Sequence, residues 1–288
     1  MLKYFSLIFT SLFLLAAIFL YQNAKLNDGK LHVVVCDVGQ GDGILIRTPD
    51  GSDILVDGGP DDSILNCLSS HLPFWDRTIE LMVLTHPHVD HAAGLIEVLK
   101  RYTVLHFVTE KVLGGTATYK RLEDELAAKK LSAQYLFSGD RIDLADKTSL
   151  LTLWPTHEWL NSNQLQAKNE QNLDLNGFCL VQLFTYGNFT LLLTGDAGSV
   201  VEDKIAAQVG KIGVLKVPHH GSKTGMSDYF LTQINPSLAI ISVGANNRYG
   251  HPAQSALDLL KNHGIKYFRT DQNGTVEVIS DGKSFAIN

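Results

Sequence analysis

The sequence predicts an α/β protein in which two mixed β-sheets pack face to face with helices on their outer sides, preceded by an apolar N-terminal segment. Short apolar runs with β-branched residues alternate with helical patterns over residues 31–288, as in layered α/β folds. Sequence patterns typical of β-hairpins occur near the start of each half of this region. The composition, with 45% hydrophobic and 19% charged residues, is that of a globular protein and excludes disordered, collagen-like and coiled-coil chains.

The apolar segment at residues 5–20, FSLIFTSLFLLAAIFL, is uncharged and follows Lys3. Its length lies between that of a signal-peptide core and that of a minimal membrane-spanning helix, and one such segment excludes a polytopic membrane protein. Because only Ala24 among residues 22–24 suits a cleavage site, the sequence favours an uncleaved anchor over a removed signal. We expect residues 1–24 to be a membrane anchor or signal segment. Residues 31–288 are expected to form a domain outside the cytoplasm, either membrane-anchored or secreted or periplasmic.

In the first half of the domain, strands are expected at residues 31–36, 43–47, 53–56 and 81–84, and helices at 64–71, 95–101 and 119–130. The turn Pro49-Asp50-Gly51 joins the second and third strands, since proline fixes φ and glycine tolerates a positive φ. The 81–84 strand, LMVL, is apolar throughout and is therefore expected to be buried.

In the second half, strands are expected at residues 150–154, 178–184, 190–194, 214–217, 238–243, 266–269 and 276–279, with helices at 202–209 and 256–263. Tyr186-Gly187-Asn188 predicts a hairpin between the second and third of these strands. The polar stretch 161–176, rich in Asn and Gln, is expected to be a loop. The three cysteines, Cys36, Cys67 and Cys179, are widely spaced and odd in number, so we expect buried free thiols.

The net charge of −6 argues against extensive nonspecific wrapping of nucleic acid, which needs a basic face. It leaves open a nucleic-acid substrate that is held by metal ions and a few local cations. The chemistry of the chain is therefore expected to lie in particular motifs.

The strongest motif is Thr85-His86-Pro87-His88-Val89-Asp90-His91, which directly follows the 81–84 strand. Its three imidazoles and one carboxylate can turn inward around metal, and these donors suit zinc, manganese or iron. Asp90 and His91 are adjacent and cannot easily share a centre with His86 and His88. The spacing therefore suggests two neighbouring metal ions.

Three further motifs follow predicted strands, where open α/β folds gather their sites. They are Leu193-Thr194-Gly195-Asp196, Pro218-His219-His220-Gly221-Ser222-Lys223 and Asn246-Asn247-Arg248-Tyr249-Gly250-His251-Pro252. Together with the histidine motif they predict a single cleft.

These motifs resemble a known family. The histidine motif is similar to the H-x-H-x-D-H motif of the metallo-β-lactamase superfamily. The segments at 37–42 (DVGQGD), 57–59 (DGG), 192–196 (LLTGD), 219–224 (HHGSKT) and 249–252 (YGHP) resemble the metallo-β-lactamase-like domain of the ComEC/Rec2 competence proteins. The resemblance covers about residues 31–279. It implies a four-layer αββα sandwich and a metal-dependent hydrolase, and for the competence branch a phosphodiesterase or nuclease that acts on DNA during uptake.

The resemblance also implies two divalent ions, zinc or manganese, and no nucleotide cofactor. His86 and His88 would hold the first ion, Asp90, His91 and His219 the second, and Asp196 would bridge the two. The implied reaction is hydrolysis by a hydroxide that the metals generate from water.

The remaining candidate residues have supporting or alternative roles. Asp90 and His220 are the expected catalytic residues, and His220 is also an alternative metal ligand to His219. The expected substrate-binding residues are Lys223, Arg248 and His251, the last also an alternative ligand or a turn cap. The expected structural supports are Asp37, Asp42 and Asp57.

The chain departs from the superfamily pattern in two ways. Many members have another histidine between the histidine motif and the bridging aspartate, and here that interval offers only His106 and His157. The corresponding segment of the competence branch has a serine where this chain has Cys179. The first ion is therefore short of a ligand. The competence channel proteins also carry a many-helix membrane domain, whereas this chain has one apolar segment.

Three functions remain open. The first is a phosphodiesterase or nuclease with DNA or another phosphodiester as substrate. The second is a hydrolase of a small ester, thioester or lactone, because the same metal pair serves acyl chemistry. The third is a non-catalytic binding module, which would hold little metal and hydrolyse nothing.

Overall fold

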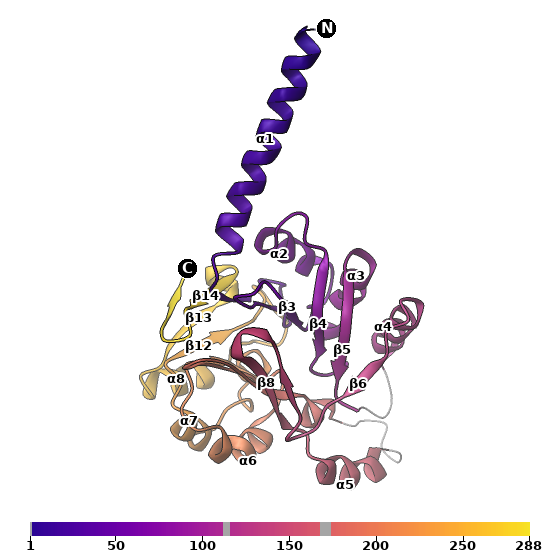
Figure 1. The fold of residues 1–288 in the computed structure, drawn as a ribbon. Coiled ribbons are helices and arrows are strands. Elements are labelled where there is room, and N and C mark those ends of the chain that lie inside the picture. Colours follow the sequence, from indigo (N-terminus) through magenta and orange to yellow (C-terminus); the bar gives the residue numbers. More distant parts are fainter. Residues whose placement is uncertain (1, 112–115, 168–173) are drawn as a thin grey trace.

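The computed structural model describes residues 2–111, 116–167 and 174–288. Helix α1 (Leu2–Leu26) projects from a layered α/β domain (Figure 1). Its residues Leu7–Leu26 are long and apolar enough to cross a membrane, and none of them is buried against the domain. The assignment of α1 as an anchor or signal remains a prediction, as does the boundary of the domain.

Two mixed sheets form the centre of the domain. The first contains, in spatial order, β15 (Phe285–Ile287), β14 (Val276–Ser280), β1 (Leu31–Val35), β2 (Ile44–Arg47), β3 (Asp53–Val56), β4 (Thr78–Leu84), β5 (Thr103–Thr109) and β6 (Ala133–Tyr135). The second contains β13 (Lys266–Arg269), β12 (Leu238–Ile241), β11 (Val214–Lys216), β10 (Phe189–Leu193), β9 (Val181–Tyr186), β8 (Thr148–Trp154) and β7 (Arg141–Asp143).

Helices cover the outer face of each sheet. Helices α2 (Ser63–His71), α3 (Val89–Arg101) and α4 (Ala117–Ala128) pack on the first sheet, and α6 (Ser199–Val209), α7 (Asp228–Ile234) and α8 (Gln254–Asn262) on the second. Two more, α5 (His157–Ala167) and α9 (Thr270–Asn273), lie in connections between strands. The order helix, sheet, sheet, helix confirms the predicted αββα sandwich.

Apolar side chains fill each of the three interfaces between layers. The inner faces of the two sheets bury a common cluster that includes Ile46, Phe184 and Ile240. Separate clusters lie between each sheet and its helices, with Leu95 and Phe230 among their fully buried members. Because every strand near the centre is covered on both sides, its sequence is apolar almost throughout rather than alternating.

The hairpins were placed correctly, and several other elements were not. β2 and β3 pair across the Pro49-Asp50-Gly51 turn, and β9 and β10 pair across Gly187-Asn188. Helix α3 begins at Val89 and not at residue 95, so the end of the histidine motif lies in its first turn. The stretch expected to be a loop at 161–176 is helical as far as Ala167, while residues 168–173 lie outside the described residues.

The expectation of three free thiols was wrong. Cys36, at the end of β1, forms a disulfide with Cys67 of α2, and their Cα atoms are 5.9 Å apart. Cys179 is buried and free. The pairing was not visible in the sequence because it depends on how α2 folds back over the first sheet. The disulfide closes a loop of 31 residues between the sheet and its covering helix.

Loss of this bond should lower stability without changing the fold. Closing a loop of this size contributes about 3 kcal/mol by restricting the unfolded chain, so Cys67→Ser should unfold at a lower denaturant concentration. Reduction of the wild-type protein should cause the same shift, and reductant should not affect the variant further. Thiol titration of the denatured, unreduced protein should find one thiol; three would show that the bond does not form.

Candidate metal centre

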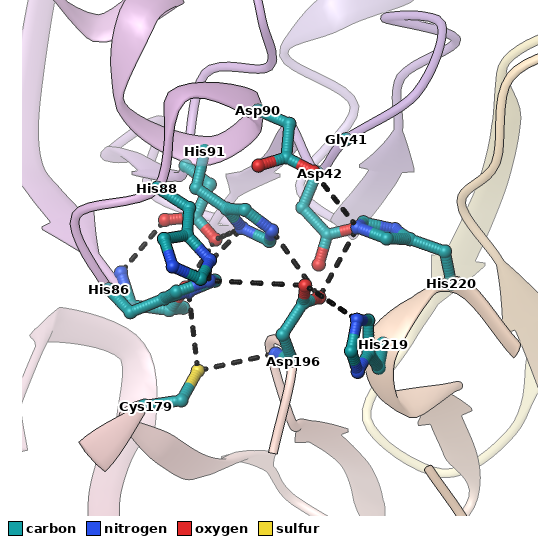
Figure 2. Close-up of polar contacts among 12 residues, drawn as sticks. Gly41, Asp42, His86, His88, Asp90, His91, Cys179, Asp196, His219 and His220 are labelled. Carbon is teal, nitrogen blue, oxygen red and sulfur yellow. Dashed lines mark hydrogen bonds and ion pairs between the residues drawn. The ribbon is translucent and has the colours of Figure 1, made fainter. Parts of the chain in front are cut away.

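The predicted metal ligands meet where loops from both sheets converge, and Figure 2 shows them gathered around Asp196. β4 leads directly into the histidine motif, and β10 delivers Asp196 from the facing sheet. β11 leads to His219 and His220. Since the ends of these strands lie at one edge of the sandwich, their loops can contribute to a common site.

Four side chains form a group compact enough to hold a metal ion: Asp90, His91, Asp196 and His220. Oδ1 of Asp196 lies 3.3 Å from Nε2 of His91 and 3.3 Å from Nε2 of His220. Oδ2 of Asp90 lies 3.6 Å from the same His220 nitrogen. Asp90 is partly exposed, whereas the other three residues are buried.

Unsatisfied polar atoms in this group indicate a cation between them. Nε2 of His91, Oδ1 of Asp196 and Nε2 of His220 are buried, and none has a hydrogen-bond partner within the described ranges of the chain. Buried polar atoms are normally hydrogen-bonded, so three that face one another call for an explanation. Imidazole nitrogen and carboxylate oxygen are donors for zinc and manganese. The four side chains therefore fit a divalent ion.

The electrostatics of the group lead to the same conclusion. Burial opposes ionisation of Asp196, but the charges of His220 and His91 hold its pKa well below the usual range. Burial also opposes protonation of both histidines, yet Asp196 raises their pKa values well above the ordinary value. The group thus stabilises positive charge at its centre. A divalent ion can take the place that protons hold on the imidazoles.

Asp57 fixes the orientation of His91. Its Oδ2 lies 2.7 Å from Nδ1 of His91, and the carboxylate also accepts hydrogen bonds from the backbone N–H and the hydroxyl of Thr85. With Nδ1 engaged, the ring presents Nε2 to Asp196. A carboxylate that holds the far nitrogen of a ligand histidine is a common support for metal binding.

Asp42 and Lys216 support His220 in a similar way. Nζ of Lys216 lies 2.7 Å from Oδ2 of Asp42, and both side chains are almost completely buried. Nδ1 of His220 lies 3.4 Å from the other Asp42 oxygen and donates to the carbonyl of Ser242 at 2.9 Å. Burial disfavours the Asp42 carboxylate, but Lys216 and His220 outweigh it and lower its pKa to about 2. His220 therefore also presents Nε2 to the centre.

His219 and His220 are consecutive but have different surroundings. Both have a left-handed backbone, with φ of 49° and 53°. His220 is 1% exposed and belongs to the compact group. The His219 side chain is 28% exposed, and its Nε2 lies 3.7 Å from Oδ2 of Asp196. The sequence assigned the ligand role to His219 with His220 as the alternative, and the geometry favours His220.

His86 and His88, the expected ligands of a first ion, lie beside the compact group. Nε2 of His86 is 3.0 Å from Nδ1 of His88 and 3.9 Å from Oδ2 of Asp196. Burial and the nearby charge of His91 lower the pKa of His86 well below its ordinary value, so the ring is neutral and can donate a lone pair. Asp196 directs one oxygen toward His86 and the other toward the compact group. This arrangement is the one required of a bridging carboxylate.

Two residues that the sequence did not assign to the site border this first position. Sγ of Cys179 lies 3.6 Å from Nδ1 of His86 and accepts the backbone N–H of Asp196 at 3.3 Å. It contacts the edge of His86 opposite Nε2, so it supports the ring and does not face the metal. Oδ1 of Asn176 is buried, has no hydrogen-bond partner among the described residues, and belongs to a residue that lines the cleft with His88.

Asn176 is therefore a candidate for the donor that the sequence left missing beside His86 and His88, and an amide oxygen is a donor that suits manganese. The only sequence signal was its place before Cys179. His106 and His157, the two histidines that the sequence offers as the missing donor, do not line the cleft. His157 stacks on Phe137 with ring centroids 3.9 Å apart, and His106 is exposed on β5.

The centre lies on the floor of a cleft of about 480 Å³, which Tyr249 and His251 also line. A second hollow of about 650 Å³ contains Trp159 and shares Asn176, Asp196 and His219 with the first. The metal centre thus lies where two hollows meet.

The other predicted residues are farther from the centre. Lys223 and Arg248 are exposed and line neither hollow, and the Arg248 guanidinium lies over the Tyr249 ring. Asp37 is exposed and accepts the backbone N–H of Gly39, which is a turn contact. Burial and the neighbouring His219 and His220 lower the pKa of His251.

Comparison with known proteins agrees with this geometry. Residues 36–157 match the family described as the metallo-beta-lactamase superfamily. The fold is similar to that of YhfI, a metallo-beta-lactamase fold protein from Bacillus subtilis, with a TM-score of 0.57 and 12% identity over 85% of this chain and 98% of YhfI. The fold, the candidate metal-binding group and this match make the chain similar to the metal-dependent hydrolases of the metallo-β-lactamase superfamily.

The predicted resemblance to competence proteins is confirmed. The chain is 28% identical to ComE operon protein 3 of Bacillus subtilis over 273 residues, covering 87% of this chain and 33% of that protein. It is 29% identical to Recombination protein 2 of Haemophilus influenzae over 258 residues, covering 88% of this chain and 29% of that protein. The chain spans about a third of the length of these curated relatives.

The two neighbouring histidines offer a direct test of the ligand assignment. His220→Ala should weaken metal binding by more than the roughly 10- to 100-fold that loss of an outer support costs, because it removes a ligand. His219→Ala should retain the ion at the compact group. Equilibrium dialysis with zinc and with manganese would measure both, with His251→Ala as a control from the same cleft. Equal loss in the two variants would contradict the assignment.

Proposed function

We propose that the domain is a phosphodiesterase that cleaves DNA or a related polyanion outside the cytoplasm. The observation that carries this proposal is the position of the metal centre at the junction of two hollows. A substrate that continues on both sides of the scissile bond, such as a nucleic-acid strand, fits this arrangement better than a small ester. The names of two relatives, Competence protein ComA of Neisseria gonorrhoeae and Recombination protein 2, also favour DNA.

The residues of the chain have distinct roles in this proposal. Asp90, His91, Asp196 and His220 would hold one divalent ion, and His86, His88, Asp196 and Asn176 would hold the other. When bound, such ions neutralise charge on a phosphate and make water a stronger acid. Among these side chains, His91 is held by Asp57 and His220 by Asp42 with Lys216, so these two rings need little reorganisation when substrate binds.

His219 is the best-placed group for moving a proton. Its side chain lines both hollows, is partly exposed, and is not required in the compact group. Asp90 and His220, the expected catalytic residues, both belong to the compact group, and we assign them ligand roles. We infer that Nε2 of His219 holds or delivers a proton on the substrate side of Asp196.

Two features support the proposed compartment. Helix α1 is long and apolar enough to span a membrane. The Cys36–Cys67 disulfide is typical of domains in an oxidising compartment, because cytosolic thiols are kept reduced. Together they support a membrane-anchored domain on the outer side of the cytoplasmic membrane.

The proposed activity can be tested with the full chain in detergent. Manganese or zinc should support cleavage of single-stranded DNA and of an aryl phosphodiester, and Asp196→Asn should abolish both because it removes the bridging charge. His219→Ala should keep its metal but lose most of the rate. Metal-dependent hydrolysis of aryl esters or lactones without phosphodiester cleavage would overturn the proposal in favour of acyl chemistry.

The rim of the cleft provides a second test. Tyr249 is 55% exposed, so Tyr249→Ala should fold normally. Loss of one base–aromatic contact costs about 1–3 kcal/mol, so KM for an oligonucleotide should rise roughly 5- to 150-fold. Turnover of the small aryl phosphodiester should not change. Tyr229→Ala is the matched control, since Tyr229 is 47% exposed on α7, outside both hollows; an equal effect there would contradict a role for Tyr249 in binding.

A further inference from the structure

An apolar surface lies beside the C-terminal end of α1, in the loop between α2 and β4. Phe74 is 50% exposed and Trp75 is 37% exposed. The Trp75 ring lies against Phe19 of α1 with centroids 4.4 Å apart, and Phe74 packs edge-on against Trp75 at 4.9 Å. The loop and the helix therefore present one continuous apolar surface, which we call the aromatic shelf (Phe19, Phe74 and Trp75).

The shelf is held to the end of α1 by a buried cation. The guanidinium of Arg47, which is 4% exposed, donates to the Leu26 carbonyl at 3.0 Å and to Oδ1 of Asn27 at 2.7 Å. It also lies 3.3 Å from Oδ2 of Asp76, the residue that follows Trp75. One side chain of β2 thus joins the end of α1 to the loop.

A direct hydrogen bond adds to this connection. The backbone N–H of Phe74 donates to Oε1 of Gln22 at 2.9 Å. The loop therefore has a fixed position along α1, with Trp75 at the level of Phe19 and Phe74 near the level of Gln22. It cannot move away from the helix without breaking contacts at both ends.

The position of the loop along α1 determines how deep the aromatic shelf would lie in a bilayer. The uncharged apolar run at residues 5–20 spans about 24 Å at 1.5 Å per residue, which accounts for most of the roughly 30 Å hydrocarbon core of a bilayer. Gln22, Asn23 and Lys25 are polar and belong among the headgroups. Phe19 and Trp75 then lie at the boundary between headgroups and acyl chains, which is where Trp and Tyr concentrate in membrane proteins.

We propose that the aromatic shelf inserts into the surface of the bilayer that α1 crosses, so that the domain contacts lipid at a second point. The partner is a phospholipid bilayer because the shelf is continuous with a helix whose apolar side chains from Leu7 to Tyr21 are exposed. This inference rests on the proposed membrane placement of α1. It is independent of the reaction that the domain catalyses.

Brominated lipids offer a direct test, since they quench only tryptophans that reach the acyl chains. The full chain would be reconstituted in phosphatidylcholine vesicles with bromine near the top of the acyl chains. The chain has three tryptophans, and Trp154 and Trp159 lie within the domain. Bromine should quench the Trp75 contribution at least about twofold, as expected for an interfacial residue. The quenched component should be absent from Trp75→Phe, which retains an aromatic ring and should fold normally.

Flotation of the same vesicles separates the two ways in which the inference can fail. Wild-type and Trp75→Phe chains should both float if α1 is inserted. Floating chains with equal quenching in the two proteins would overturn the shelf and leave the placement of α1 intact. Failure of both proteins to float would overturn the shelf together with the anchor. Neither outcome affects the cleavage assay, which is run in detergent.

Discussion

The buried negative charge of Asp196 is the constraint on which the architecture of the site depends. A carboxylate at 3% exposure is costly unless positive charge surrounds it, and here imidazoles from both sheets approach its two oxygens. This need explains why the strands that carry the site end at the same edge of the sandwich. It also explains why Nε2 of His91, Oδ1 of Asp196 and Nε2 of His220 remain without hydrogen bonds among the described residues: their proper partner is a cation and not another side chain.

The supports behind the ligands follow one pattern. Asp57 engages Nδ1 of His91, while Asp42 and the Ser242 carbonyl engage Nδ1 of His220. In each ring the far nitrogen is occupied and Nε2 is left for the metal. The close approach of the loops depends on glycine, because a Cβ at Gly41 would lie 2.1 Å from the Asp90 carbonyl oxygen. The glycines of the motifs are thus as much a part of the site as its donors.

Much of the fold and the outline of the site could be predicted because both depend on local patterns. Apolar runs revealed the central strands, and the spacing of His86, His88, Asp90 and His91 indicated metal binding. Strand β5 was missed because its first half is exposed or only partly buried, and the edge strands β6, β7 and β15 were missed because they are short and not fully buried. The features that could not be predicted depend on which distant residues the fold brings together. The sequence cannot show which of the adjacent residues His219 and His220 turns inward. Neither the Cys36–Cys67 disulfide nor the position of Asn176 at the cleft can be inferred from sequence spacing.

The hydrogen bonds from Arg47 to the end of α1 have a mechanical consequence. Because the helix and the domain share a buried hydrogen-bonded joint, rotation of α1 about its axis must turn the domain with it. Successive residues of an α-helix are separated by about 100°. Each added or deleted residue in the middle of α1 would therefore swing the mouth of the cleft by about that angle relative to the upper part of the helix. The length of α1 thus sets the direction in which the domain faces around the helix axis as well as its distance from the upper end of the helix. Any molecule that packs against the upper turns of α1 determines the direction in which the cleft opens.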